Sequence, residues 1–244
     1  MTRFFVDPAD FFGSDTLMLT GENAAHARVL RLTPGEEVAI SDGNGNEAVC
    51  QVVDCGNKET LLKVRTRGLS SSEAKVKVTV YMAFSKADKL EHVIQKATEL
   101  GAYEIIAFPS SRCVSRPDAK SLGKKLERWQ KIALSAAEQS GRGYIPKVIA
   151  LDSYSQALER ALEADLPILL YENEHATTLK MALEEKDYSS VALISGPEGG
   201  LEAQEVERAS DLGVHVCTLG RRILRCETAP LCALSAVMYA SGEF

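Results

Sequence analysis

The sequence has no excess of basic residues, few aromatic residues and no long apolar run. Its 244 residues include 28 basic and 34 acidic side chains, which gives a formal net charge of −6. This balance, with 45% hydrophobic residues, excludes a disordered chain and a wholly basic nucleic-acid coat protein. The acidic total also argues at first against a nucleic-acid partner, because lysine and arginine supply most phosphate binding.

Membrane and metal-binding patterns are missing as well. No run reaches the roughly 18 apolar residues of a membrane-spanning helix, and Met1–Pro8 lacks the basic and apolar regions of a signal peptide. The six cysteines contain no CxxC pair, which excludes the usual spacing of a zinc site and predicts free buried thiols. We therefore expect a cytoplasmic protein that uses neither a membrane nor a metal ion.

The N-terminal region, residues 1–70, is predicted to form a small β-barrel. Short β-rich segments alternate with turn residues, and one helix interrupts them over Glu22–Leu30. The segment Asp42–Asn46 predicts a hairpin turn, since its glycines and asparagines adopt positive φ easily. Small polar residues over 68–75 predict a linker. The expected strands are Arg3–Val6, Thr16–Thr20, Glu37–Ser41, Glu47–Val53 and Thr60–Thr66.

After the linker, strands and helices alternate to the end of the chain. Such alternation predicts an α/β fold with a parallel sheet and helices on both of its faces. For the first helix, Ser85 with Asp88 predicts a capping box, and Gly101 predicts the end. The expected strands are Val76–Phe84, Glu104–Phe108, Lys147–Ala150, Pro167–Tyr171, Val191–Ser195 and Val214–Leu219. The expected helices are Lys86–Leu100, Ser121–Ser140, Tyr154–Ala164, Ala176–Glu185, Glu202–Asp211 and Pro230–Ala240.

Glycine is absent from the turn where a dinucleotide-binding fold needs it. That turn, Phe84–Asp88, contains none, and no Walker sequence is present, which argues against a nicotinamide-dependent dehydrogenase. The glycines instead follow a late strand, in Gly196-Pro197-Glu198-Gly199-Gly200. Ligands of parallel sheets bind at the carboxyl ends of strands, so we expect the site in the C-terminal half.

Two late loops carry the candidate chemistry. Residues 196–200 combine a rigid turn, one carboxylate and a following helix N-terminus, although an ordinary tight turn would have the same spacing. Residues 219–229 place three arginines beside Ile223 and Leu224, with Glu227 close by. An exposed charged run is the structural alternative there, but it would not need large apolar residues.

These residues resemble the SPOUT methyltransferases, and within them the ribosomal RNA small-subunit methyltransferase E family. The resemblance rests on the 196–200 sequence together with Leu219-Gly220-x-x-Ile223-Leu224-Arg225-x-Glu227-Thr228-Ala229. It extends over nearly the whole chain through His26-x-x-Val29-Leu30-Arg31, Lys96–Gly101, and Ala137-Glu138-Gln139-Ser140-x-Arg142 with Ile145-Pro146. Two positions depart from the family pattern: Cys226 replaces a small residue, and Leu201 replaces phenylalanine.

The resemblance implies a PUA-like RNA-binding β-barrel over 1–70 and a SPOUT methyltransferase domain over 76–244 with a deep C-terminal trefoil knot. It also implies a homodimer and S-adenosylmethionine as cofactor, bound where three loops converge. The implied cofactor-binding residues are Leu170, Glu172, Gly196, Pro197, Gly199, Gly200, Leu219, Gly220, Ile223, Leu224 and Thr228. Carboxylates of Glu172, Glu198 or Glu227 would offset the sulfonium charge.

The implied reaction is methylation of N3 of a specific uridine in the 16S rRNA of the 30S subunit. N3 carries a proton that must leave, and it lies on the Watson–Crick edge, so the base must be unpaired or flipped out. Glu198 is the first candidate for the general base and Glu138 the alternative, while Arg225 would stabilise the uracil oxyanion.

The net charge conceals a basic middle segment. Residues 76–150 contain 13 basic and 7 acidic side chains, whereas residues 151–244 contain 7 basic and 16 acidic ones. On the predicted helix over 121–140, basic residues recur at three- and four-residue steps along one face, which is typical either of an RNA-binding surface or of a solvated one. The candidate RNA-binding residues are Arg28, Arg31, Lys86, Arg112, Arg116, Gln139 and Arg142.

Other functions stay open at this point. A SPOUT enzyme could act on another RNA target, such as a tRNA or a ribose 2′-hydroxyl. A non-enzymatic RNA-binding factor for ribosome assembly is a further alternative, although the two late loops argue against it. Trp129, the only tryptophan, fits an apolar helix stripe and is predicted to pack in the core rather than to stack on a base.

Overall fold

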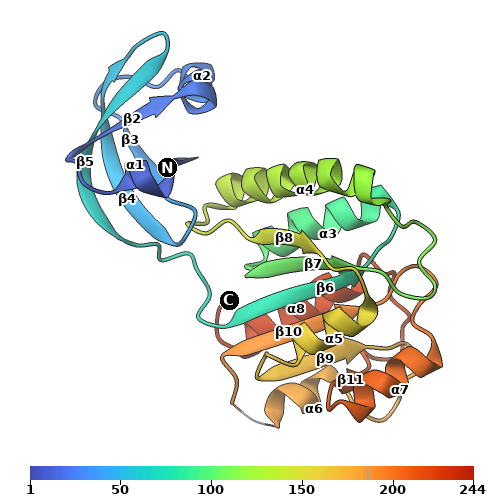
Figure 1. Cartoon of the computed structure of the whole chain (residues 1–244). Helices are drawn as coiled ribbons and strands as arrows, with labels where there is room; N and C mark the ends of the chain where they lie inside the picture. Colours follow the sequence, from blue (N-terminus) through green and yellow to red (C-terminus); the bar gives the residue numbers. More distant parts are fainter. Residues whose placement is uncertain (186) are drawn as a thin grey trace. The chain divides into compact units, whose positions relative to one another are not determined.

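The chain folds into two compact units, each built around its own sheet (Figure 1). The computed structural model describes residues 1–185 and 187–244. The first unit contains Met1–Glu73 and Ala137–Ile145, and the second contains Ala74–Ala136 and Pro146–Phe244. A short segment from the middle of the sequence thus packs with the N-terminal unit.

The first unit is a curled sheet of five strands in the order β1-β3-β4-β5-β2, in which β1 pairs parallel with β3 and the other pairs are antiparallel. Phe4, Leu19, Ile40 and Leu62 are completely buried in its core. Its elements are β1 Thr2–Phe5, α1 Pro8–Phe11, β2 Thr16–Thr20, α2 Gly21–Val29, β3 Glu37–Ser41, β4 Asn46–Cys55 and β5 Glu59–Leu69.

The predicted hairpin turn is confirmed between β3 and β4. The Asp42 carboxylate accepts hydrogen bonds from the backbone N–H groups of Asn44 and Asn46, and Gly43 and Gly45 have φ values of 76° and 97°. Two details differ from the prediction. Strand β5 continues to pair with β4 into the first part of the expected linker, and α1 is too short for a periodic pattern to have indicated it.

The second unit has the predicted α/β fold. All six strands are parallel, in the order β11-β9-β10-β6-β7-β8. Helices α3, α4, α6 and α8 share one core with the sheet, and α5 and α7 share another on the opposite face. The strands are β6 Lys77–Ala83, β7 Glu104–Phe108, β8 Lys147–Ala150, β9 Leu166–Leu170, β10 Ser190–Ser195 and β11 His215–Cys217. The helices are α3 Ala87–Glu99, α4 Ala119–Ser140, α5 Tyr154–Ala161, α6 Leu179–Glu184, α7 Ala203–Asp211 and α8 Ala229–Ala240.

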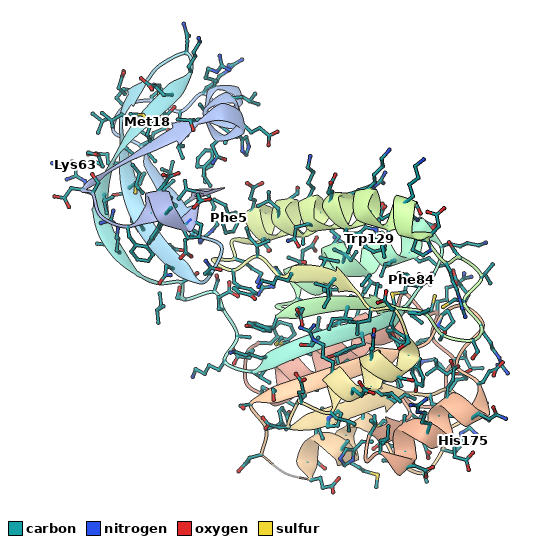
Figure 2. All side chains as sticks on the ribbon, viewed as in Figure 1. Phe5, Met18, Lys63, Phe84, Trp129 and His175 are labelled. Carbon is teal, nitrogen blue, oxygen red and sulfur yellow. The ribbon has the colours of Figure 1, made fainter. Side chains whose placement is uncertain are left out.

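Trp129 lies in the core, as predicted. Its side chain is 2% exposed and packs on the α4 face that is turned toward the sheet (Figure 2). Among the residues described, no helix is both long enough and apolar enough to cross a membrane.

The start of α3 corrects one prediction. The expected capping box of Ser85 and Asp88 is not formed, because the N-cap residue is Lys86 and no side chain of this segment caps the helix. The Ser85 hydroxyl donates instead to the Lys86 carbonyl. The predicted stop is confirmed, since Gly101 has φ 92° directly after the helix end.

Candidate active site

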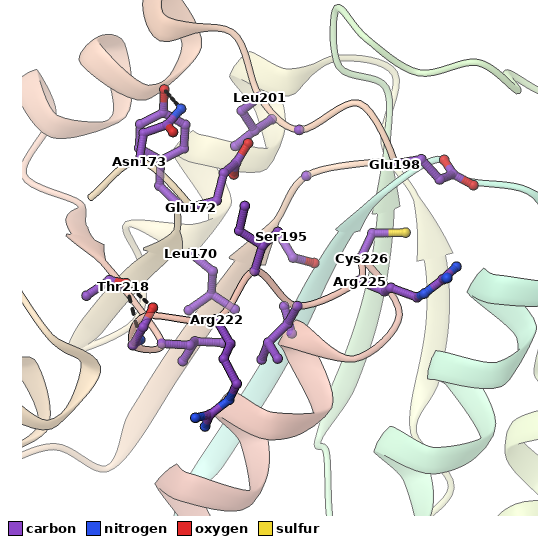
Figure 3. A pocket seen from close by; sticks show the side chains of 18 of the residues that line it. Leu170, Glu172, Asn173, Ser195, Glu198, Leu201, Thr218, Arg222, Arg225 and Cys226 are labelled. Carbon is purple, nitrogen blue, oxygen red and sulfur yellow. Dashed lines mark hydrogen bonds between the residues drawn. The ribbon is translucent and has the colours of Figure 1, made fainter. Parts of the chain in front are cut away.

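Three loops of the second unit meet at the carboxyl edge of its sheet. They follow the strands β9, β10 and β11, which lie side by side and run parallel, so that their loops emerge at the same edge. Together with Lys89 of α3 and the beginning of α8, these loops line a cavity of about 620 Å³ (Figure 3). The convergence of three loops that the resemblance implied is therefore present.

The cavity brings together most of the expected cofactor-binding residues and both first candidates for catalysis. Gly199 and Thr228 are not among its lining residues: the Gly199 carbonyl accepts a hydrogen bond from Arg112, and Thr228 is the N-cap residue of α8. The predicted residues that line it are Leu170, Glu172, Gly196, Pro197, Glu198, Gly200, Leu219, Gly220, Ile223, Leu224 and Arg225.

The backbone conformation at position 200 favours glycine. Its φ is +69°, and a Cβ atom placed there would lie 2.5 Å from Oε1 of Glu172. A Cβ atom at Gly196 would likewise lie 3.1 Å from the backbone of Gly200 and Leu201. The loop after β10 is thus folded tightly on itself, with the Glu172 carboxylate directly against it.

Glu198 is anchored through one of its two carboxylate oxygens. Oε1 accepts the backbone N–H of Lys86 at 3.0 Å and lies 3.8 Å from Nζ of Lys89. Oε2 is buried and has no hydrogen-bond partner among the residues described. One oxygen is therefore held in place, while the other retains its capacity to accept a proton.

Lys89 also forms an ion pair with Glu227, with Nζ and Oε2 3.1 Å apart. The Cys226 thiol donates to the same carboxylate at 3.2 Å. The hydrogen bond to Glu227 raises the pKa of Lys89, while burial raises the pKa of the Cys226 thiol to about 12. For Glu227, burial acts to raise the pKa, but hydrogen bonds from its own backbone N–H, Cys226 and Lys89 outweigh it and lower the pKa.

Arg225 and Glu138, the other two candidate catalytic residues, lie in different parts of the structure. Arg225 is exposed, and its carbonyl accepts the N–H groups of Thr228 and Ala229 at the start of α8. Glu138, the alternative general base, belongs to the first unit and does not line the cavity; burial raises the pKa of its carboxyl.

Six of the seven predicted RNA-binding residues are exposed. Lys86 precedes α3, whereas Arg112 and Arg116 lie in the loop after β7, where each donates to a nearby backbone carbonyl. Arg28 and Arg31 lie at the end of α2, and Gln139 lies near the end of α4.

Arg142 is the exception, because its side chain is 5% exposed and pairs with Glu73 at 2.7 Å. The Glu73 carboxylate also accepts the backbone N–H groups of Gly143 and Tyr144. The buried guanidinium is thus held inside the first unit by a partly exposed carboxylate, and the ion pair joins residue 73 to the turn after α4.

Several lining residues were not among the predicted site residues. Most of them lie at or just after the ends of β9, β10 and β11, so strand ends were the available signal. Lys89 had no such signal, because it lies on a helix far from both loops in the sequence. These additional lining residues are Lys89, Tyr171, Asn173, His175, Ser195, Leu201, Thr218, Arg221, Arg222, Cys226 and Ala229. Within the described part of the chain, no group of three or more His, Cys, Asp or Glu side chains is arranged so that it could hold a metal ion.

Known families match both units. The sequence matches the family described as RNA methyltransferase domain over residues 72–238, and the family described as RNA methyltransferase PUA domain over residues 19–64. The parallel sheet, with a cavity at its carboxyl edge, is thus that of an RNA methyltransferase.

Sequence relatives identify the family within the RNA methyltransferases. The chain is 37% identical over 247 residues to the ribosomal RNA small subunit methyltransferase E of Bacillus subtilis (strain 168), covering 98% of this chain and 96% of the relative. It is 34% identical over 236 residues to the Mycobacterium bovis protein of the same name, covering 96% of this chain and 90% of the relative. The chain belongs to the ribosomal RNA small subunit methyltransferase E family.

Solved structures show the same fold. One is a ribosomal RNA small subunit methyltransferase E from Neisseria gonorrhoeae bound to S-adenosyl methionine, with a TM-score of 0.84 and 28% identity over 98% of this chain and 97% of that one. Another is a methyltransferase of Legionella pneumophila in complex with the same cofactor, with a TM-score of 0.84, 29% identity and the same coverage.

Proposed function

We propose that this protein transfers the methyl group of S-adenosylmethionine to N3 of a specific uridine in the 16S rRNA of the 30S subunit, in the cytoplasm. The observation that carries the proposal is the cavity of about 620 Å³ built by three loops of adjacent parallel strands. Membership in the family supports the rRNA target, and relatives that bind S-adenosylmethionine support the cofactor.

The lining of the cavity suits this cofactor. Leu170, Leu201 and Leu219 offer apolar contact for adenine, and the glycines at 196 and 200 leave the loop backbone accessible. Glu172 and Glu198 place negative charge where a cation would bind. When bound, S-adenosylmethionine supplies a methyl group on a positively charged sulfur, which leaves as a neutral thioether.

Glu198 is the proposed general base. The N3 proton of uridine must be removed for its electron pair to become available, and Oε2 of Glu198 is a buried acceptor with no partner among the described residues. Arg225 lines the same cavity and would stabilise the negative charge that develops on the uracil oxygens. In the view of Figure 3, Glu198, Cys226 and Arg225 lie on one side of the pocket, and Glu172 and Asn173 lie on the other.

The exposed basic residues are proposed to bind the rRNA backbone. Arg28 and Arg31 in the first unit, with Lys86, Arg112 and Arg116 in the second, would neutralise phosphates, and Gln139 would add a hydrogen bond. A PUA-like RNA-binding barrel over 1–70 and a methyltransferase domain over 76–244 fit this division of roles.

Two features implied by the family resemblance belong to the same proposal. The chain would form a homodimer, and its C-terminal segment would be threaded into a deep trefoil knot. Light scattering coupled to size-exclusion chromatography tests the first, with a mass of twice 26.5 kDa expected and a single-chain mass against it.

The deciding experiment is methylation of 30S particles that lack the modification, followed by mass mapping of the product base. A methyl group at N3 of one 16S uridine is the expected result. Methylation of a tRNA or of a ribose 2′-hydroxyl would assign another target, and RNA binding without any methyl transfer would indicate a non-enzymatic assembly factor. Lys180→Met, on an exposed lysine of α6, is a control that should methylate at the normal rate.

A further inference from the structure

The outer face of α4 carries a row of basic side chains that the cavity does not use. This α4 basic row consists of Lys120, Lys124, Arg128 and Lys131, all of them exposed. Steps of four, four and three residues place them on one side of the helix, over a length of about 16 Å. Trp129 packs on the other side, toward the sheet. Figure 2 shows several side chains that end in nitrogen on the outer side of α4.

The three lysines of the row are available to a ligand. Among the residues that the structure describes, they form neither an ion pair nor a hydrogen bond. Arg128 pairs with Glu91 of α3 at 2.7 Å, yet its side chain is still 69% exposed. Glu127 is the exposed acidic residue of α4 and lies beside the row. Four cations against these two carboxylates leave the α4 face positively charged.

The helices on the opposite face of the sheet have the opposite charge. The exposed charged residues of α5 and α7 are Glu159, Glu207, Arg208 and Asp211. A polyanion is therefore attracted to the α4 side of the second unit and repelled from the side of α5 and α7. The sheet separates two surfaces that suit different partners.

The row begins near the edge of the sheet where the cavity lies. Helix α4 follows the loop after β7, and in this loop Arg112 donates to the carbonyl of Gly199, in the loop after β10, at 3.2 Å. Arg116 lies between Arg112 and the first lysine of the row in the sequence, and it is exposed as well. The α4 basic row thus continues the basic residues already proposed to contact RNA beside the cavity.

The composition of this face indicates which form of RNA it suits. Single-stranded nucleic acid is held largely by aromatic side chains that stack on its bases, and the only aromatic residue of α4, Trp129, is buried. In double-helical RNA the major groove is too narrow for side chains, so proteins contact phosphates and 2′-hydroxyl groups. A straight row of cations without exposed aromatic residues fits the phosphates of a double helix.

We propose that the α4 basic row binds the sugar–phosphate backbone of a double-helical segment of the rRNA, independently of its sequence. This inference rests on the proposed rRNA substrate and goes beyond it, because the proposed reaction needs only an unpaired uridine at the cavity. The α4 basic row would hold paired RNA next to the target while the target base itself is unpaired.

The test measures binding to a random-sequence RNA duplex, to a single strand of the same length and to 30S particles at several salt concentrations. The variant replaces the three lysines together, as Lys120→Gln, Lys124→Gln and Lys131→Gln. Its affinity for the duplex should fall about thirtyfold at low salt. In a plot of the logarithm of the binding constant against the logarithm of the salt concentration, its slope should be smaller in magnitude by about two to three. Its melting temperature should stay that of the wild type, because the lysines are exposed and glutamine has a similar helix propensity.

Two results would overturn the inference. The first is an unchanged affinity and slope for both the duplex and the 30S particles. The second is a loss for the single strand as large as that for the duplex, because the row would then not select paired RNA.

Single substitutions provide matched controls. Lys124→Gln alone should weaken duplex binding about threefold, whereas Lys180→Gln, on an exposed lysine of α6, should leave it unchanged. Helix α6 lies by β11 at one end of the strand order, and α4 lies by β8 at the other (Figure 1). Equal losses in these two variants would show an effect of total charge and contradict a specific surface. Glu127→Gln removes the acidic residue beside the row and should tighten duplex binding, which a merely solvated helix face would not do.

The binding measurements need no methyl transfer, so they separate this inference from the proposed function. Absence of methylation by the wild-type protein, with duplex binding that depends on the three lysines, would count against the proposed function alone. In steady-state methylation the triple variant should raise KM for 30S particles and keep kcat, because the row binds substrate without touching the reacting atoms. Wild-type KM and wild-type duplex binding in the triple variant would overturn the inference and leave the proposed function in place.

Discussion

The backbone N–H of Lys86 donates a hydrogen bond to the Glu198 carboxylate at 3.0 Å, across 112 positions of sequence. A residue of the loop after β10 thereby supplies the cap that α3 lacks locally, since no side chain of its own segment provides one. The same contact orients Glu198 at the cavity. A structural and a proposed catalytic role therefore meet in a single carboxylate.

Substitutions of Glu198 should separate these two roles. Glu198→Ala removes the acceptor and should lower the free energy of unfolding by about 1 kcal/mol, as for other lost helix caps. Glu198→Gln keeps an acceptor oxygen and should cost less stability, but it cannot take up a proton. Denaturant titration and single-turnover methylation measure the two effects. Near-normal turnover by Glu198→Gln with normal cofactor binding would contradict the role of general base.

Glycine 200 should be intolerant of a side chain. Gly200→Ala forces a Cβ atom toward Glu172 in a backbone conformation of positive φ, so it should destabilise by about 1 kcal/mol or more and weaken binding of S-adenosylmethionine. Gly123 lies inside α4 with open space around it, so Gly123→Ala should instead stabilise by up to about 1 kcal/mol. Calorimetric titration with the cofactor and thermal melting test the pair. Equal effects of the two substitutions would contradict the explanation.

Arg142 should contribute to stability, unlike the exposed arginines. Arg142→Ala leaves Glu73 without its buried partner and should cost about 3 kcal/mol of unfolding free energy. Arg28→Ala removes an exposed charge, so stability should change by less than about 0.5 kcal/mol. In a plot of the logarithm of the rRNA binding constant against the logarithm of the salt concentration, the slope for Arg28→Ala should be smaller in magnitude by about one, because one phosphate contact is lost. A salt dependence unchanged in Arg28→Ala would remove this residue from the RNA footprint.

Acid should weaken the hydrogen bonds that Asp165 accepts from Ser189 and Ser190 in the second unit. Asp165 accepts hydrogen bonds from the backbone and hydroxyl groups of Ser189 and Ser190, with the backbone bond of Ser189 the largest cause, and these lower its pKa to about 2. A depressed pKa stabilises the fold above the unfolded-state pKa of about 3.9, and this contribution is lost as the pH falls to about 2.

Asp165→Asn should accordingly melt at a lower temperature than the wild type at neutral pH, and the difference should shrink between about pH 4 and pH 2. Glu207→Gln, on an exposed carboxylate of α7, serves as the comparison and should show little difference at any pH. A gap between wild type and Asp165→Asn that persists undiminished to pH 2 would refute this assignment.

Much of the architecture was predictable because the signals are local. Alternating strand and helix patterns predicted the parallel sheet, and the Asp42–Asn46 turn predicted its hairpin. The order of the six strands was not predictable from periodicity, because a pattern shows which face of an element is buried but not which strand lies beside it. The capping box at Ser85 failed for a similar reason: the sequence offered a local cap, and tertiary structure supplied a remote one.

The sequence by itself determined the fold class, the location of the candidate site in the C-terminal half and the basic character of the middle segment, since all of these depend on residue type and spacing along the chain. Only the tertiary structure decided that Lys89 lies between Glu198 and Glu227 and that Arg142 is buried against Glu73. These are contacts between residues far apart in sequence. Their burial and charge balance arise when strands and loops pack together, and that packing leaves no periodic mark on the chain.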